Sequence, residues 1–348
     1  MTFEGLIDQS RVEKAKVIRA TPNSVRRMKR TRWVWYPFVP LGEIVILTGA
    51  TDLGKSTICI DIAGAVTRGK LNGQWHGVPQ NVLYVAFEDT IEVDITPKLV
   101  ATDADRDLFW DVEVKNGSMY LPEDIGALQE LVDQTSAKVI FIDPISSVIR
   151  GDQNKAEIVR PALESIRDFA SKNGVAVIGV RHQRKGNTGG ATEGISGSNE
   201  WANISRCALA VKENREQPGQ FVTSITKNNR APRSERINLL YTFEHVPVEL
   251  DDGEEPQLTP KIKWLGETAL DVNTMMEEAS NGARSGDVGD ATAWLEAYMA
   301  DQGGEAAQNE IYKAGKAVGL SEATITAARG RLKLPSSPGL DGIVWRLS

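Results

Sequence analysis

Nine consecutive residues near the start of the chain have the types and spacing that bind phosphate groups. They read Gly49-Ala50-Thr51-Asp52-Leu53-Gly54-Lys55-Ser56-Thr57, which fits the Walker A pattern G-x-x-x-x-G-K-[ST]. In this pattern, backbone N–H groups cradle the phosphates of a nucleoside triphosphate, the lysine reaches the β- and γ-phosphates, and the serine hydroxyl binds Mg²⁺. We therefore expect ATP and Mg²⁺ to bind here, with Lys55 on the phosphates and Ser56 on the metal.

The residues on either side of this loop support the same interpretation. Ile44 to Thr48 form a short apolar run typical of a buried strand, and Ser56 to Val66 have the pattern of a buried helix. A strand that turns through glycines into a helix presents the positive end of that helix to the phosphates. The alternative is a glycine turn that fits the pattern by chance, which leaves both flanks unexplained.

Two acidic residues close apolar runs further along the chain. Asp143 follows residues 139–142, which together give the Walker B pattern, and Glu88 follows residues 82–87. In a parallel sheet the carboxyl ends of the strands face the ligand crevice, so both carboxylates would lie near the loop. They are our candidates for the metal-binding acid and the base that a triphosphate site requires. Asp89 is an alternative acid beside Glu88, and for Asp143 the structural alternative is the start of a turn before a proline.

From Gly42 onward the hydrophobic pattern alternates between strands and helices. Strands are predicted at 44–48, 82–87, 138–142 and 175–180, and helices at 55–67, 124–134 and 156–171. Such alternation is typical of right-handed βαβ units and predicts an α/β fold with a mostly parallel sheet flanked by helices. After His182, strands predicted at 206–212, 221–226, 237–243 and 261–265 follow without long helices. We expect them to add antiparallel strands at one edge of the sheet.

Composition narrows the possible classes of protein. With 348 residues, the chain is long enough for one large domain and a smaller one. Its only cysteines, Cys59 and Cys207, are too few for a disulfide framework or a zinc site. The apolar runs are too short to span a bilayer and the first residues lack an apolar signal core, so we expect a cytoplasmic protein with no membrane partner. The net charge of −7 argues against a surface coated in basic patches but is compatible with a local basic channel.

The two ends of the chain differ from its middle. Residues 1–32 form a basic arm, with nine lysines and arginines between Arg11 and Arg32 against Glu13 alone. A solvated arm, a helix that docks a partner and a segment that contacts phosphates all remain open for it.

At the other end, residues 249–288 are acidic and rich in turn-forming residues, which predicts a solvated loop and linker. Helices predicted at 291–299, 306–318 and 321–332, followed by a hairpin, give residues 289–348 the outline of a winged helix-turn-helix domain. Ser321 is expected to cap the last of these helices. The basic side chains of this domain are outnumbered by acidic ones, so DNA contact, protein docking and simple capping all remain open.

Residues 30–245 resemble the RecA-like ATPases, a group that includes RecA, the DnaB-type replicative helicases and the small RepA-type hexameric helicases of plasmids and phages. The resemblance is carried by the Walker A loop, by Asp143, and by a glutamate at the end of the second strand that is not adjacent to Walker B. It implies that residues 33–248 form a RecA-like core and that Glu88 is the catalytic base. It also implies a γ-phosphate sensor at the end of the fourth strand, where His182 is followed by Gln183; we assign the role to His182. Asp52 departs from the family, which often has glycine there, but aspartate tolerates the left-handed conformation.

Two further sets of basic residues take their expected roles from this resemblance. Arg184 and Lys185 open a long glycine-rich loop, which in the family lines a central channel and touches single-stranded DNA. The alternative is a surface loop with two ordinary charges. Lys227 and Arg230 leave a later strand, where the family has a lysine and an arginine that reach into the neighbouring subunit's site. The spacing here is K-x-x-R followed by Ala-Pro instead of K-x-R and glycine, so which of the two makes the contact stays open, with Arg206 as a rival.

Together these features predict an ATP-hydrolysing motor on single-stranded DNA. The resemblance implies a homo-oligomer, either a hexameric ring or a filament, with the nucleotide at subunit interfaces and a role and partners in replication or recombination. Two alternatives remain. One is a recombination filament in which ATP controls a DNA-binding state, and the other is an accessory ATPase that a partner regulates and that does not translocate.

Overall fold

The computed structural model of the chain describes residues 20–115, 117–182, 200–339 and 342–347. The chain separates into a unit of residues 1–31 and a unit of residues 32–348. In the first unit, residues 20–30 are exposed and include a 3-10 turn at Asn23–Val25. The part of the expected basic arm before residue 20 lies outside the described residues. No helix within the described ranges is both long and apolar enough to span a membrane.

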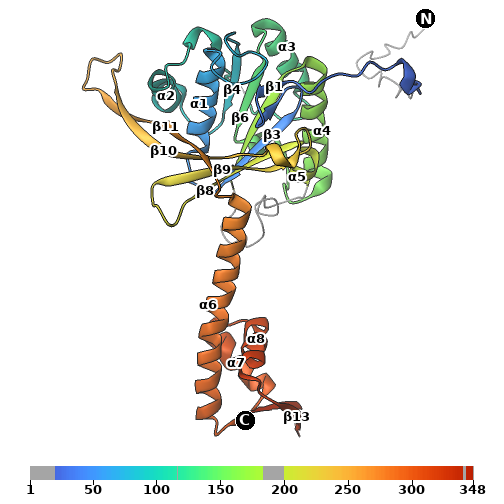
Figure 1. Ribbon diagram of the computed structural model, residues 1–348, viewed down its shortest axis with the longest axis vertical. Coiled ribbons are helices and arrows are strands. Elements are labelled where there is room, and N and C mark those ends of the chain that lie inside the picture. Colours follow the sequence, from blue (N-terminus) through green and yellow to red (C-terminus); the bar gives the residue numbers. More distant parts are fainter. Residues whose placement is uncertain (1–19, 116, 183–199, 340–341, 348) are drawn as a thin grey trace, which may run out of the picture. The chain divides into compact units, whose positions relative to one another are not determined.

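In the described part of the second unit, nine strands form one sheet in the order β11-β10-β9-β8-β3-β7-β6-β4-β5 (Figure 1). The strands are β3 (Ile44–Gly49), β4 (Val82–Ala86), β5 (Phe109–Asp111), β6 (Val139–Asp143), β7 (Ala176–His182), β8 (Cys207–Glu213), β9 (Gln220–Asn228), β10 (Asn238–Val248) and β11 (Gln257–Thr268). The pairs from β8 to β5 are parallel, and the pairs from β8 to β11 are antiparallel. This confirms the predicted α/β fold, with its mostly parallel sheet and antiparallel strands at one edge.

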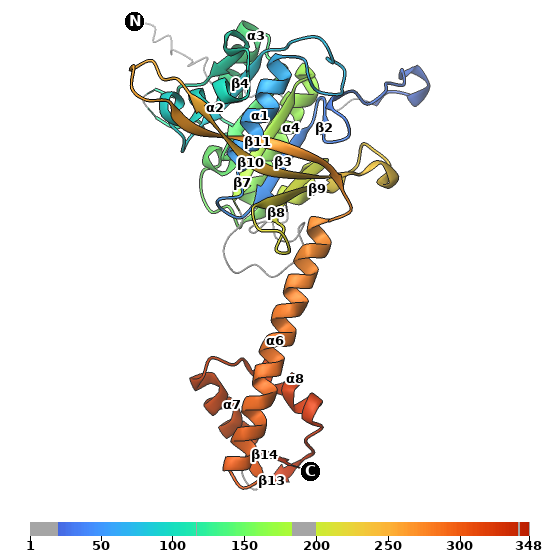
Figure 2. The same ribbon diagram turned by 60° about the vertical axis from the view of Figure 1, so that its left-hand side comes forward.

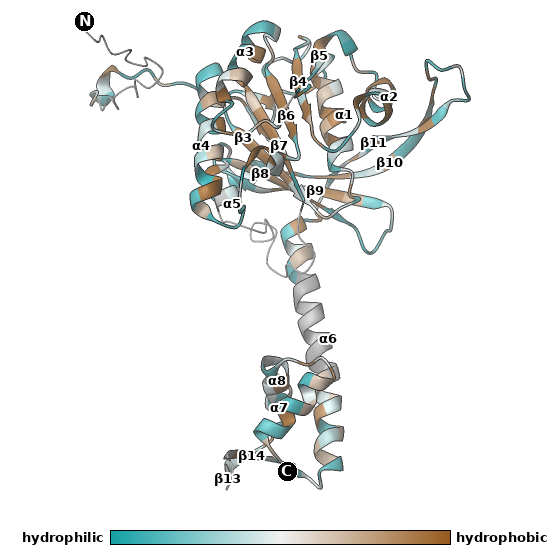
Figure 3. Ribbon diagram, turned by 180° about the vertical axis from the view of Figure 1, so that it is seen from behind, coloured by the Kyte–Doolittle hydropathy of each residue, from teal (hydrophilic) through white to brown (hydrophobic). Residues whose placement is uncertain are grey.

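The central strands of this sheet are hydrophobic along their length, as the hydropathy colouring shows, and helices cover both faces of the sheet (Figure 3). On one face, Val45 and Leu47 of β3 pack in a core with α1 (Lys55–Thr67) and α2 (Thr96–Ala101). On the other, Ile44 and Ile46 pack with α3 (Ile125–Thr135) and α4 (Ala156–Asn173). Successive strand residues point to opposite faces, so a strand buried on both reads as a continuous apolar run. A short helix, α5 (Glu200–Ile204), joins the second core, and a lead-in hairpin of β1 (Trp33–Trp35) and β2 (Val39–Pro40) precedes β3.

Strands β10 and β11 form a long hairpin at the edge of the sheet (Figure 2). Strand β9 pairs with β10 only as far as Thr242, beyond which the hairpin continues as a two-stranded ribbon. The loop and linker predicted at 249–288 is shorter in the structure, because the segment contains β11, which includes the strand predicted at 261–265, and the first turns of a helix, α6 (Val272–Asp301). Five acidic residues of the segment lie between Glu249 and Glu255, at the tip of the hairpin. Further along, buried Ile262 packs in the core, and the Asp271 side chain caps α6 by accepting from the N–H groups of two residues in its first turn.

The last part of the chain has its own small core. It consists of the end of α6, β12 (Glu305–Ala307), α7 (Gln308–Ala317), α8 (Glu322–Leu332), β13 (Ser336–Gly339) and β14 (Gly342–Arg346). Leu295, Ile311, Ile325 and Trp345 are buried together here, and the strands pair in the order β12-β14-β13. Ser321 caps α8 as expected, since its hydroxyl accepts a hydrogen bond from the Thr324 N–H. Three helices and a hairpin match the expected winged-helix outline, to which β12 adds a strand that the sequence did not predict.

Candidate active site

The loop between β3 and α1 has the backbone shape of a phosphate cradle. It leaves β3 at Gly49 and enters α1 at Lys55, with Asp52 at φ 64° and Gly54 at φ 70°. Both angles are left-handed, a region that glycine occupies freely and that aspartate tolerates, as expected for Asp52. At Gly54 a Cβ atom would lie 2.4 Å from the ring of Phe243, so the close approach of β10 requires a glycine there. The first N–H groups of α1 have no partner within the helix and are available to an anion.

Lys55 is folded back onto this loop. Its side chain is 3% exposed, and its Nζ donates a hydrogen bond to the carbonyl of Ala50. Burial lowers the pKa of Lys55, while the charge of Asp143 acts in the opposite direction. A buried ammonium that is held by one neutral carbonyl gains from a nearby anion, because opposite charges attract each other more strongly in a poorly solvated site than in water.

Asp143 lies at the carboxyl end of β6 with two hydroxyl donors on its carboxylate. It is 7% exposed; the Tyr84 hydroxyl donates to its Oδ2 at 3.0 Å, and the Ser56 hydroxyl also donates to it. Burial raises the pKa of Asp143, and these two hydrogen bonds lower it in part. A serine hydroxyl beside a carboxylate is the oxygen ligand set that Mg²⁺ takes in P-loop sites, so Ser56 and Asp143 fit this metal. The sequence prediction missed Tyr84, whose role depends on β4 lying next to β6 in the sheet.

Glu88 and His182 meet at the ends of two other strands. Glu88 follows β4 by two residues, His182 is the last residue of β7, and the distance from Glu88 Oε2 to His182 Nε2 is 3.6 Å. Glu88 is 63% exposed at its side chain, whereas Nδ1 of His182 is buried and has no hydrogen-bond partner within the described part of the chain. A water-accessible carboxylate beside an imidazole is an arrangement that can orient water and move a proton.

Nine residues that the sequence proposed for the site line one cavity of ≈330 Å³: Thr51, Asp52, Gly54, Lys55, Ser56, Thr57, Glu88, Asp143 and His182. This volume is at the lower end of those of small-molecule sites, about 300–1,000 Å³. The cavity is also lined by Tyr84, Asp89 and Lys98. Of these, the sequence prediction named only Asp89, as the alternative acid, and left Tyr84 and Lys98 unassigned. The phosphate loop, the Lys55 ammonium, the candidate metal ligands and the candidate base therefore all line the same cavity.

Lys227 and Arg230, the predicted contacts to a neighbouring subunit, lie away from this cavity. Lys227 Nζ donates to the carbonyl of Asn203 at 3.2 Å, and Arg230 pairs with Glu43. Glu43 immediately precedes β3, at the opposite end of that strand from the phosphate loop, and a strand of six residues spans roughly 20 Å. Neither basic residue lines the cavity of its own chain. Burial lowers the pKa of Lys227, and the charge of Arg206 adds to this effect.

Arg184 and Lys185, the expected DNA contacts, fall within residues 183–199, as does Gln183, and so lie outside the described residues. His182 is the last described residue before them.

Comparison with models of protein families matches the N-terminal half of the chain. The model of the AAA domain family matches residues 13–188, which is just over half of the chain. The matched stretch contains the loop and all nine predicted residues that line the cavity, and it ends before β8, so Lys227, Arg230 and the C-terminal domain lie outside it. A search of the curated proteins finds no match.

Proposed function

The chain belongs to the AAA domain family of P-loop ATPases, and from this premise we propose that it couples ATP hydrolysis to movement along single-stranded DNA. The observation that supports this most is the convergence of Glu88 and His182 on the cavity that holds the Walker residues, with a contact of 3.6 Å between them. Glu88 leaves β4 while Asp143 leaves β6. The candidate base and the metal ligand therefore come from different strands, as the resemblance to RecA-like motors implies.

The residues of the cavity would each take a different role in hydrolysis. Lys55 would exchange the carbonyl of Ala50 for phosphate oxygens of ATP, and Ser56 and Asp143 would hold Mg²⁺, which when bound neutralises charge on the β- and γ-phosphates. Glu88 would accept the proton of the attacking water, which its exposed carboxylate can reach from solvent. Because His182 contacts Glu88 directly, a change at the γ-phosphate would move both residues.

The link to DNA is made along the chain. His182 directly precedes the segment that begins with Gln183, Arg184 and Lys185. Cations of this kind contact the phosphate backbone of a single strand without selecting its sequence. His182 would respond to the γ-phosphate, and the residues that follow it would contact DNA. Loss of the γ-phosphate on hydrolysis could therefore move the DNA-contacting segment.

Assembly into a ring or filament would complete the site. Lys227 and Arg230 lie at the end of the sheet away from their own chain's cavity, so either could reach a nucleotide only in another copy. For Arg230 this would exchange the carboxylate of Glu43 for a phosphate, and an arginine finger supplied in this way raises turnover about 10³–10⁵-fold.

The experiment that tests the proposal is unwinding of a forked DNA duplex by the full-length protein with ATP and Mg²⁺, with Glu88→Gln as the inactive control. ATP-dependent strand separation is the expected result. Strand exchange between homologous DNAs without unwinding would instead identify the recombination filament. Neither activity, with hydrolysis intact, would identify an accessory ATPase that a partner controls.

A further inference from the structure

Lys98 is a second lysine in the nucleotide cavity, beside Lys55. It lies on α2, a helix of six residues whose neighbouring side chains fix its orientation. Pro97 and Leu99 are buried against the core of the sheet, so the residue between them faces away from that core. The Lys98 side chain is 17% exposed, compared with 72% for Lys115, an ordinary surface lysine. Burial of this degree needs a reason, because lysine is seldom buried without a partner.

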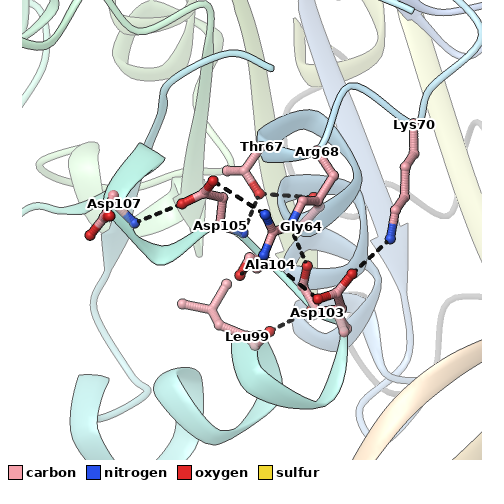
Figure 4. Close-up of polar contacts among 10 residues, drawn as sticks. Gly64, Thr67, Arg68, Lys70, Leu99, Asp103, Ala104, Asp105 and Asp107 are labelled. Atoms are coloured by element: carbon pink, nitrogen blue, oxygen red, sulfur yellow. Dashed lines mark hydrogen bonds and ion pairs between the residues drawn. The ribbon is translucent and has the colours of Figure 1, made fainter. Parts of the chain in front are cut away.

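Helix α2 is fastened to α1, the helix that begins with Lys55 (Figure 4). Arg68, which follows α1, donates through Nε to the carbonyl of Asp103 at 2.9 Å and through Nη1 to Asp105 at 3.3 Å. Lys70 adds an ion pair of 3.2 Å to Asp103, and the Asp105 N–H donates to the hydroxyl of Thr67. These contacts tie the end of α1 to the turn that follows α2.

The two helices are also closely packed. A Cβ atom at Gly64 of α1 would lie 2.9 Å from the Thr102 hydroxyl oxygen, directly after α2. The N–H of Thr102 in turn donates to the carbonyl of Lys98. The backbone at Lys98 is therefore held at a fixed position relative to α1 and its phosphate loop.

The partner of Lys98 is weak. Its Nζ lies 3.9 Å from Asp89 Oδ2, which is longer than a hydrogen bond, so the two charges attract each other without one. Four carboxylates, those of Asp52, Glu88, Asp89 and Asp143, line the cavity with only these two lysines. A triphosphate entering this acidic space would gain from positive charge beyond that of Lys55 and Mg²⁺.

We infer that Lys98 is a positioning cation for the γ-phosphate, acting within the same chain. Asp89, which lies 3.9 Å from the ammonium, directly follows Glu88, the proposed base for the water that attacks the γ-phosphate. The ammonium has three N–H donors and can turn from Asp89 to a phosphate oxygen without moving its helix. This inference rests on the proposed ATPase function and deepens it. It predicts that the site distinguishes ATP from ADP partly through a residue that no Walker motif contains.

The test compares binding of ADP with binding of the non-hydrolysable β,γ-imido analogue of ATP, each with Mg²⁺, by isothermal titration calorimetry of the full chain. Lys98→Met keeps the aliphatic part of the side chain and removes the charge. It should lower the affinity for the triphosphate analogue by at least about tenfold, the lower end of the loss for one hydrogen bond to a charged group. Affinity for ADP should change by less than about twofold. Lys98→Arg should restore most of the loss, and Lys115→Met should bind both nucleotides like the unchanged protein.

Equal loss for both nucleotides, or no loss for either, would overturn the role of Lys98, as would failure of Lys98→Arg to bind better than Lys98→Met. If the unchanged protein binds neither nucleotide, the proposed function fails, and this inference fails with it. That outcome is distinct from failure of Lys98 alone, in which the unchanged protein still binds both.

Discussion

The hydrogen bond from Tyr84 to Asp143 allows a prediction with a magnitude and a sign. The Tyr84 hydroxyl donates to Asp143 Oδ2 at 3.0 Å, and both side chains are buried. Burial raises the pKa of Tyr84 well above its ordinary value, so its hydroxyl remains a neutral donor. Tyr84→Phe keeps the shape of the ring and removes only this donor, leaving Ser56 as the remaining hydroxyl on the carboxylate.

Loss of a hydrogen bond to a charged group costs roughly 1.5–3 kcal/mol, which corresponds to a further rise of about one to two units in the pKa of Asp143. The sign follows from linkage. Because burial raises the pKa of folded Asp143 above its unfolded value, the stability that its protonated form contributes is present at acid pH and lost as pH rises through the folded pKa. Tyr84→Phe enlarges that loss. The variant should therefore be about 1.5–3 kcal/mol less stable than the unchanged protein at neutral pH, and this difference should shrink as pH falls through the raised pKa of Asp143.

Denaturant unfolding of both proteins at a series of pH values measures this difference. Tyr241→Phe is the matched control, since Tyr241 is equally buried and its hydroxyl donates at 2.7 Å to an uncharged acceptor, the carbonyl of Leu53. Its loss should be about 1 kcal/mol and independent of pH. A loss for Tyr84→Phe that is the same at every pH, or absent at neutral pH, would refute the assignment of Asp143 as an ionised carboxylate held by Tyr84.

Three further predictions concern the phosphate loop, the base and the subunit contact. Gly54→Ala should lower stability by at least about 1–2 kcal/mol and abolish nucleotide binding, because φ is 70° and the new Cβ meets Phe243; Gly126→Ala, at a helix glycine with open space around it, should be neutral or stabilising in the same denaturation assay. Lys55→Ala should abolish hydrolysis, while Glu88→Gln should bind ATP and turn it over about 10²–10⁴-fold more slowly, and near-normal turnover would show that Glu88 is not the base. Mixing inactive Glu88→Gln with inactive Arg230→Ala should restore part of the ATPase activity, because some interfaces then pair an intact base with an intact arginine; no recovery would place the finger elsewhere, with Lys227 the next candidate.

The parts of the fold that the sequence predicted correctly are those set by local pattern. Strand β3, the loop and α1 follow one another within 24 residues, and each carries its own signature of apolar run, glycine turn and buried helix. Asp143 and Glu88 could be placed for the same reason, since each closes an apolar run and parallel strands bring such ends together. His182 follows Arg181 and was assigned from the resemblance to the RecA-like ATPases.

What the sequence could not predict depends on which elements become neighbours. Tyr84 looks like one more apolar residue of a strand until β6 pairs beside it. Lys98 follows an irregular segment, and only the packing of α2 against α1 brings it into the cavity. The predicted loop and linker at 249–288 was too long because five acidic residues at the tip of the hairpin dominate its composition. The strand predicted at 261–265 is only the middle of β11, whose full length depends on its pairing with β10.

The central claim is that this cavity hydrolyses ATP in response to single-stranded DNA. Steady-state ATPase activity of the full chain with and without single-stranded DNA tests it most directly, with Lys55→Ala as the blank. The account predicts hydrolysis above the blank that DNA strongly stimulates. Hydrolysis that DNA leaves unchanged would contradict the DNA motor, and activity no higher than that of Lys55→Ala would contradict the assignment of the site itself.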